Sequence, residues 1–317
     1  MSLYSLIRHY TFTKLSTTTL TTCACLCFSY TTTAQQEWGY SQYFFNLFDV
    51  NSAYAGNHGN PSFAIRARRQ WPGLPGSPFS QSFSIHKPLG TLPLGIGLRV
   101  FHETIGARNH WGVKMNAAYK MDVHSGTLSA GASFGIIHES LDLTRLNIRD
   151  EDDLVRLQNT WNSTLPDVDV SILYNTKRFW LGSEFSRINR SPYDWSEGSS
   201  SRLYYQISTT GGKIYRVGND DLFQVSGLFK WSEGAIWQAE MNAALLWNDL
   251  IWIGAGYRFL FGPVFFAEWN LSSQMRLGYS YDIGVGNTLG PFGPSHELFI
   301  GFNMQGSTGR TLQFDQK

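Results

Sequence analysis

Apolar and small polar residues alternate in short stretches that recur along most of the chain. In residues 127–137, TLSAGASFGII, the even positions hold Leu, Ala, Ala, Phe and Ile, and the odd positions hold only Thr, Ser and Gly until the final Ile. A period of two residues predicts β-strands with one apolar and one polar face. Repeated along a chain, such strands are typical of a transmembrane barrel, whose apolar face contacts lipid and whose polar face lines the interior.

The pattern therefore predicts an all-β protein, a transmembrane antiparallel β-barrel of about 14 strands. The strands are expected near residues 62–70, 80–88, 92–103, 109–121, 126–140, 167–175, 178–187, 202–215, 221–231, 235–247, 250–260, 263–270, 273–282 and 296–304. Short connections alternate along most of the chain with long ones, which include 71–79, 141–166, 188–201 and 283–295. This alternation fits short periplasmic turns and longer outer loops, whereas a soluble β-sandwich has no reason to sort its loops by side. An even strand number also predicts both termini on the periplasmic side.

The first residues read as an export signal. Arg8 and Lys14 precede an apolar, threonine-rich stretch, and the small residues that end at Ala34 predict cleavage before Gln35. A membrane anchor or a lipoprotein attached at Cys23 is the alternative. All three cysteines lie within this signal, so the exported chain is expected to contain none. The predicted organisation is a signal peptide at 1–34, a periplasmic N-terminal segment and possible plug at 35–61, the barrel at 62–304, and a tail at 305–317.

Composition supports export to the bacterial outer membrane. Without residues 1–34 the chain keeps 23 basic and 24 acidic residues, a net charge of −1, which gives no electrostatic footprint for nucleic acid. After the signal no charge-free apolar stretch of about 18 residues occurs, so spanning helices are not expected. Aromatic residues make up 15% of the chain, with 11 Trp, which suits the aromatic girdles of a barrel in the lipid bilayer.

Strand parity predicts which charged side chains face the interior. A charge on the lipid face near the bilayer midplane costs about 2–4 kcal/mol, so the lumen is the favourable place for them. The expected lumen charges are Arg66, Arg68, Arg99, Glu184, Glu240, Arg258, Glu268 and Arg276. They either pair and fill the bore or line a selective pore, and the sequence leaves both open.

No pattern predicts catalysis, a cofactor or a metal centre. Residues 131–135, GASFG, match the G-x-S-x-G motif of serine hydrolases, but that motif needs a strand-to-helix turn and here lies within a predicted strand. The histidines show no zinc-ligand spacing. The acidic run 150–153 lies in the longest outer loop, where it is either a solvated segment or a calcium site.

Two segments carry a more specific signal. Residues 38–56 read WGYSQYFFNLFDVNSAYAG, and residues 68–90 read RRQWPGLPGSPFSQSFSIHKPLG. They resemble the PorP/SprF family of Bacteroidota outer-membrane proteins, whose members open with SQY-x-FN … NPAYAG and continue with R-x-QW-x-G-x-x-G-x-P and H-x-PL. Residues 165–192 resemble the central hairpin of that family. The chain departs from the pattern at Ser52, where the family usually has Pro, and in the tail after Met304.

The resemblance implies a non-enzymatic barrel linked to type IX secretion and gliding motility, which helps to deliver or anchor a large secreted adhesin or other type IX cargo. The alternatives are a core secretion barrel that contacts the periplasmic ring, or a passive channel for small solutes. The aromatic segment 38–56 could plug the bore or contact a periplasmic partner, and the proline-rich loop after the first strand suits a contact surface. The partner or plug candidates are Tyr43, Phe45, Asn46, Tyr54, Trp71, Pro72, Pro75 and Pro78.

Overall fold

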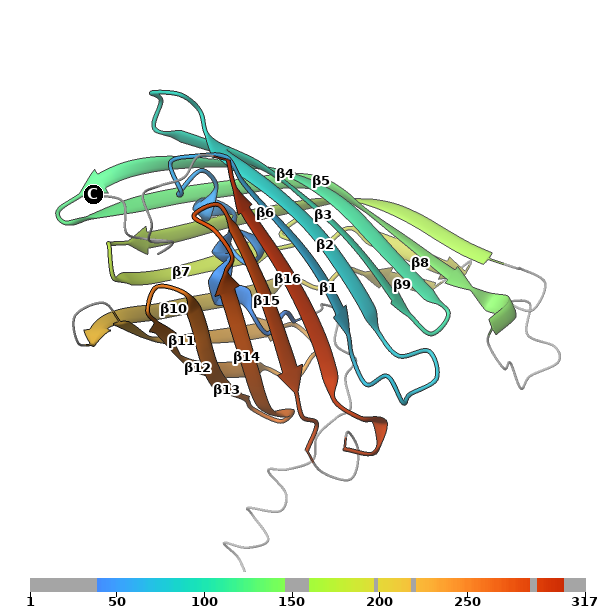
Figure 1. The fold of residues 1–317 in the computed structure, drawn as a ribbon. Helices are drawn as coiled ribbons and strands as arrows, with labels where there is room; N and C mark the ends of the chain where they lie inside the picture. Colours follow the sequence, from blue (N-terminus) through green and yellow to red (C-terminus); the bar gives the residue numbers. More distant parts are fainter. Residues whose placement is uncertain (1–38, 146–159, 197–198, 218–220, 286–289, 305–317) are drawn as a thin grey trace, which may run out of the picture. The chain divides into compact units, whose positions relative to one another are not determined.

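Among the residues that the structure describes, fourteen antiparallel strands close into one barrel (Figure 1). The structure is a computed structural model, and its described residues all fall in one compact unit, residues 36–317. It describes residues 39–145, 160–196, 199–217, 221–285 and 290–304. The predicted signal peptide, the acidic run 150–153 and the predicted tail 305–317 therefore lie outside the described residues.

The barrel strands follow one another around the wall in sequence order. They are β1 (Ser62–Arg69), β2 (Phe79–Pro88), β3 (Leu94–Ile105), β4 (Arg108–Val123), β5 (Gly126–Asp142), β6 (Thr160–Asn175), β7 (Phe179–Ser186), β10 (Gln206–Val217), β11 (Asp221–Ser232), β12 (Gln238–Trp247), β13 (Ile251–Arg258), β14 (Gly262–Asn270), β15 (Met275–Asp282) and β16 (Ser295–Asn303). The barrel closes where β1 pairs with β16, in a register that runs from Ser62↔Asn303 to Arg69↔His296. The prediction of an antiparallel barrel of about 14 strands is confirmed.

The two ends of the barrel differ. The end at which β1 begins and β16 ends is called here the terminal rim, and the other end the opposite rim. Hairpin connections at the terminal rim are short, for example Asn248–Asp249–Leu250, where positive φ angles of 51° and 53° at the first two residues make a tight turn. The opposite rim carries the longer connections 143–159, 187–205 and 283–294.

Residue burial is the reverse of that in a soluble protein. In β5 the small polar residues Ser129 and Ser133 are buried, whereas Phe134 is 56% exposed on the outer surface. Met115 and Met241 are 63% and 64% exposed on the same outer surface. Apolar side chains outside and polar side chains inside are what a bilayer requires of a barrel. No helix in the described part of the chain is long and apolar enough to cross a membrane.

The strand ends differ from the prediction on one side of the barrel. β6 begins at Thr160 instead of residue 167, because its polar first residues pair with β5 outside any apolar alternation that sequence reasoning could detect. The expected loop 188–201 contains a short hairpin of β8 (Pro192–Ser196) and β9 (Ser199–Arg202). The connections after β3, β11 and β13 at the opposite rim are short, so the loops alternate in length less regularly than expected.

Candidate functional site

The N-terminal segment, residues 39–61, runs through the inside of the barrel (Figure 1, blue). It contains three single turns of 3₁₀-helix, η1 (Tyr43–Phe45), η2 (Leu47–Asp49) and η3 (Ser52–Tyr54). The Asn51 side chain caps η3 by accepting a hydrogen bond of 2.9 Å from the backbone N–H of Ala53. Short turns of this kind keep the chain narrow enough to share the bore with the inward side chains of the wall.

Aromatic side chains of the segment pack against one wall of the bore. Tyr43 is fully buried and Phe45 is 4% exposed. The Phe44 and Phe266 rings are 4.9 Å apart, and the Phe45 and Trp252 rings 6.3 Å apart, between centroids. Asn46 and Tyr54, the other two candidates in this segment, are also buried, and the Asn46 amide donates a hydrogen bond of 3.0 Å to Ser84 Oγ. In this structure these aromatics face the barrel wall instead of the periplasm.

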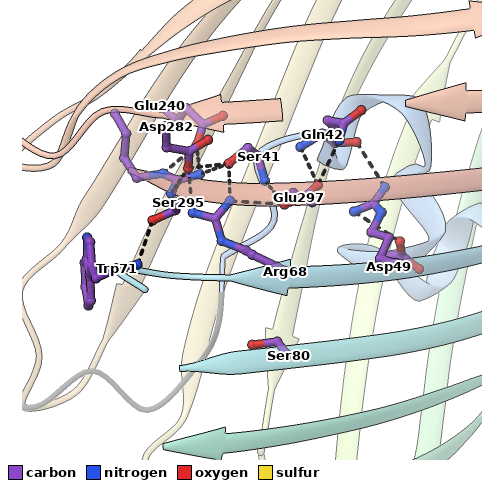
Figure 2. A network of polar contacts seen from close by, with 12 residues as sticks. Ser41, Gln42, Asp49, Arg68, Trp71, Ser80, Glu240, Asp282, Ser295 and Glu297 are labelled. Atoms are coloured by element: carbon purple, nitrogen blue, oxygen red, sulfur yellow. Dashed lines mark hydrogen bonds and ion pairs between the residues drawn. The ribbon is translucent and has the colours of Figure 1, made fainter. Parts of the chain in front are cut away.

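A cluster of ionised and polar groups holds the start of the segment near the opposite rim (Figure 2). We call this cluster the mouth cluster, and it consists of Ser41, Arg68, Glu240, Arg258, Asp282 and Glu297. Arg68 lies 2.5 Å from Asp282 and 3.2 Å from Glu297. Ser41 donates its backbone N–H to Glu297 at 2.8 Å and its hydroxyl to Asp282 at 2.7 Å. Arg68 and Arg258 also donate to Ser41 Oγ, so four strands bind one serine of the N-terminal segment.

Arg258 completes this cluster from the neighbouring wall. Its guanidinium lies 2.7 Å from Glu240 and 3.3 Å from Asp282, and it donates to Ser41 Oγ at 3.0 Å. All of these side chains are at most about a tenth exposed. Buried charges persist only when they are paired and hydrogen-bonded, and here each basic group has at least two oxygen partners.

Two further arginines bind the middle of the segment. Arg66 is 3.3 Å from Asp49 and donates to the backbone carbonyl of Gln42 at 3.0 Å. Arg276 donates to the carbonyl of Phe45 at 3.3 Å and pairs with Glu268 at 3.0 Å. The wall thus supplies donors to backbone oxygens of the broken helical turns. The carbonyl of Gln42 also accepts the N–H of Phe45 at 3.1 Å.

On the other side of the bore a second charge network meets η3. Arg99 pairs with Glu184 at 3.3 Å and with Asp169 at 3.4 Å, and Lys114 pairs with Asp169 at 2.8 Å. Glu184 accepts the backbone N–H of Ser52 at 2.5 Å. The structure therefore places all eight expected lumen charges in the bore. Six of them contact the segment, and Glu240 and Glu268 pair with an arginine that does.

Close backbone contacts fix the segment at the terminal rim. A Cβ atom added to Gly95 would lie 1.9 Å from the carbonyl oxygen of Ala55, and one added to Gly131 would lie 2.3 Å from the N atom of Ala53. The N–H of Gly56 donates to His86 Nδ1 at 3.0 Å. Glycines in β3 and β5 thus allow the segment to touch the wall backbone directly.

His58 follows this contact and is buried. Its ring stacks on that of His86 at 5.6 Å between centroids, and its Nε2 lies 3.4 Å from Tyr54 Oη. Burial, together with the positive charges of Arg276 and Lys120, lowers the pKa of His58 to about 3, so the ring is neutral at pH 7.

Adding a methyl group at Gly95 tests this contact. We expect Gly95→Ala to destabilise the folded barrel by about 1–3 kcal/mol, because the new Cβ collides with backbone that has little room to move. Gly227→Ala is the matched control, since its Cβ would meet nothing closer than 3.5 Å. The measurement is urea unfolding in detergent, followed by heat-modifiable migration on a gel. Equal midpoints for the two variants would contradict a close-packed segment.

The four candidates of the first loop lie at the opposite rim, away from the bore segment. Pro72 and Pro75 are exposed, Trp71 is half-buried and Pro78 is buried just before β2. The backbone N–H of Trp71 donates to Ser295 Oγ at 3.4 Å (Figure 2). The structure therefore divides the expected site residues into a bore group and a loop group.

Sequence reasoning omitted several partners in the bore. The carboxylates of Asp49, Asp169, Asp282 and Glu297 were not expected there. Glu297 lies on the same strand face as Phe299, which is fully buried. The alternation along this strand could therefore have indicated that Glu297 faces the bore. Ser41 carried no such signal, because it precedes the first strand.

The described residues show no other chemical centre. They contain no group of three or more His, Cys, Asp or Glu side chains that could hold a metal ion. The GASFG sequence at 131–135 lies in the middle of β5, in extended conformation, and lacks the strand-to-helix turn of a hydrolase nucleophile.

Comparison with known proteins places this barrel in a family. Residues 32–302 match the family described as type IX secretion system membrane protein PorP/SprF. The chain belongs to the PorP/SprF family. No curated protein matches the chain in sequence. As a PorP/SprF barrel it is an outer-membrane protein of the type IX secretion system, and its terminal rim, with the short turns, is assigned to the periplasm.

Solved structures resemble this PorP/SprF barrel in fold. The toluene transporter TbuX of Ralstonia pickettii has a TM-score of 0.53 at 10% identity, over 80% of this chain and 92% of that chain. The outer membrane protein Omp33 of Acinetobacter baumannii has a TM-score of 0.47 at 9% identity, over 78% of this chain and 100% of that chain. At such identity the likeness to TbuX supports the barrel fold alone.

Proposed function

We propose that this barrel is a non-enzymatic scaffold of the type IX secretion system, which helps to deliver or anchor a large secreted adhesin at the cell surface. The observation that carries the proposal is the occupied bore. A barrel whose interior holds a clamped segment of its own chain has its rims, and not its lumen, available for partners. Membership in the PorP/SprF family supports the link to secretion.

The opposite rim offers a rigid surface for such a partner. The N–H of Gly73 donates to the carbonyl of Phe292 at 2.9 Å, and the N–H of Gly106 donates to the carbonyl of Gly76 at 2.8 Å. The first loop is therefore tied to two neighbouring connections, and Pro72 and Pro75 fix its own backbone. A preformed surface binds a partner with a smaller loss of conformational entropy than a mobile loop does.

Deletion of the gene is the first test. Display of one large surface protein, measured by antibody labelling of intact cells, should be lost, while other type IX cargo still reaches the surface. Unchanged display of every such protein would refute the scaffold role. Loss of all type IX secretion would point instead to a core component that contacts the periplasmic ring.

A pair of matched double variants tests which rim is used. We expect Pro72→Ser with Pro75→Ser to reduce display of the adhesin several-fold, because the first loop at the opposite rim loses its rigid exposed prolines. Leu89→Ser with Leu92→Ser is the control at the terminal rim, where these leucines are 37% and 55% exposed. Barrel levels are followed by gel shift. A defect confined to the leucine pair would instead indicate that the partner binds at the terminal rim, on the periplasmic side.

A further inference from the structure

The direction in which the N-terminal segment crosses the bore is set by its two ends. Ser41 contacts Asp282, the last residue of β15, and Glu297, close to the first residue of β16. Both positions lie near the opposite rim. Ala55, in contrast, touches Gly95, which lies next to the first residue of β3 at the terminal rim. The chain therefore runs from the opposite rim at Ser41 to the terminal rim at Ala55, and only then enters β1.

The space around Gly39 is consistent with this direction. Gly39 is half-buried and lines a small cleft together with Lys230, Gln238 and Arg258. Gln238 is the first residue of β12 and Arg258 the last residue of β13, so this cleft also lies near the opposite rim. A Cβ atom added to Gly39 would meet nothing within 4 Å.

We infer that the chain enters the barrel through its outer mouth, so that Gly39 is accessible from the cell exterior. This corrects the expectation that both termini are periplasmic, which the even strand number suggested. Strand number fixes where β1 begins and where β16 ends. It does not fix the path of a segment that lies inside the barrel.

Two observations argue against a path in which the chain returns through the bore to the periplasm. A cavity lined by Tyr40, Arg99 and Lys230 lies beside the segment. Tyr43, Phe48 and Tyr54 are nevertheless fully buried, so a second passage of extended chain would have to displace packed side chains. If the exported chain begins at Gln35, as the sequence predicts, only residues 35–38 precede Gly39, and four residues reach at most about 14 Å. The eight residues of β1 alone extend about 26 Å along the wall.

Cysteine labelling tests this topology, since the predicted exported chain has no cysteine of its own. Gly39→Cys should react with a membrane-impermeant maleimide on intact cells. Pro75→Cys at the opposite rim is the control for the exterior. Ser125→Cys, in the exposed turn between β4 and β5, is the control for the periplasm and should react only after the outer membrane is permeabilised.

An epitope inserted after Gln35 gives a second readout in case the cleft shields the thiol at position 39. Antibody should bind the epitope on intact cells, at a level within about twofold of an epitope placed in the 283–294 loop. Detection of the residue-39 thiol or of the epitope only after permeabilisation would overturn the inference. The adhesin role would be unaffected by that result, because it is read from display of the cargo and not from the path of this segment.

Discussion

Deletion of residues 35–56 is expected to change a nearly closed barrel into one that conducts ions. In planar bilayers the intact protein should show low conductance, because the segment, its aromatic packing and its paired charges occupy the bore. Fourteen strands enclose a bore between that of a side-chain-filled eight-stranded barrel and that of an open porin, so the deletion should raise conductance by at least about tenfold. The control deletes residues 35–38 alone and leaves Gly39–Gly56 in place, so its conductance should stay low.

The fold of the deletion variant has to be verified independently. Heat-modifiable migration on a denaturing gel reports the closed barrel and separates a changed lumen from a failure to fold. A folded deletion variant that still conducts poorly would mean that wall side chains alone fill the bore. Large and stable conductance from the intact protein would favour the solute-channel alternative and contradict the plug.

Arg68→Met is expected to be the most destabilising single substitution in the mouth cluster. It removes one of the two arginine partners of Asp282, at 2.5 Å, and the arginine 3.2 Å from Glu297, which is buried completely. An uncompensated buried charge of this kind costs about 3–5 kcal/mol, so the urea midpoint of the folded barrel should fall markedly. Arg69→Met is the matched control, because Arg69 is exposed on the neighbouring strand position.

A compensating variant distinguishes lost charge pairing from lost packing. Adding Glu297→Gln to Arg68→Met removes a carboxylate that the first substitution left without its arginine, and should recover part of the stability. If the double variant is no more stable than Arg68→Met, the loss comes from packing of the long arginine side chain and not from its charge.

Strand parity is the reason that so much of the wall could be predicted from the sequence. Lipid on one side and polar groups on the other impose a period of two on every strand, so Arg66, Arg99 and Glu268 could be assigned to the inner face without knowledge of the fold. The first and last residues of most strands could be predicted from the turn residues that flank them. Where both strand faces are polar, as at the start of β6, this signal vanishes and the strand was expected to begin too late.

The pairing of charges across the bore could not be predicted in the same way. Whether Arg99 meets Glu184 depends on the stagger of strands around the barrel, which is a property of the closed sheet and not of any one strand. The contacts of Ser41 and the direction of its segment depend in turn on those charges. Local pattern therefore predicts which groups face inward, and barrel geometry decides which of them meet.

The mouth cluster has a consequence for the order of assembly. Arg68 and Glu297 are direct partners across the β1–β16 pair, which is the junction that closes the barrel. Glu297 thus lacks Arg68 until the first strand joins the last, whereas Asp282 already has Arg258 on β13, and Ser41 has to be in place between them at that moment. A chain that closed first would exclude its own N-terminal segment. Insertion of the segment and closure of the wall are therefore one cooperative step, and a barrel that misses it leaves Glu297 without Arg68, which favours reopening over release into the membrane.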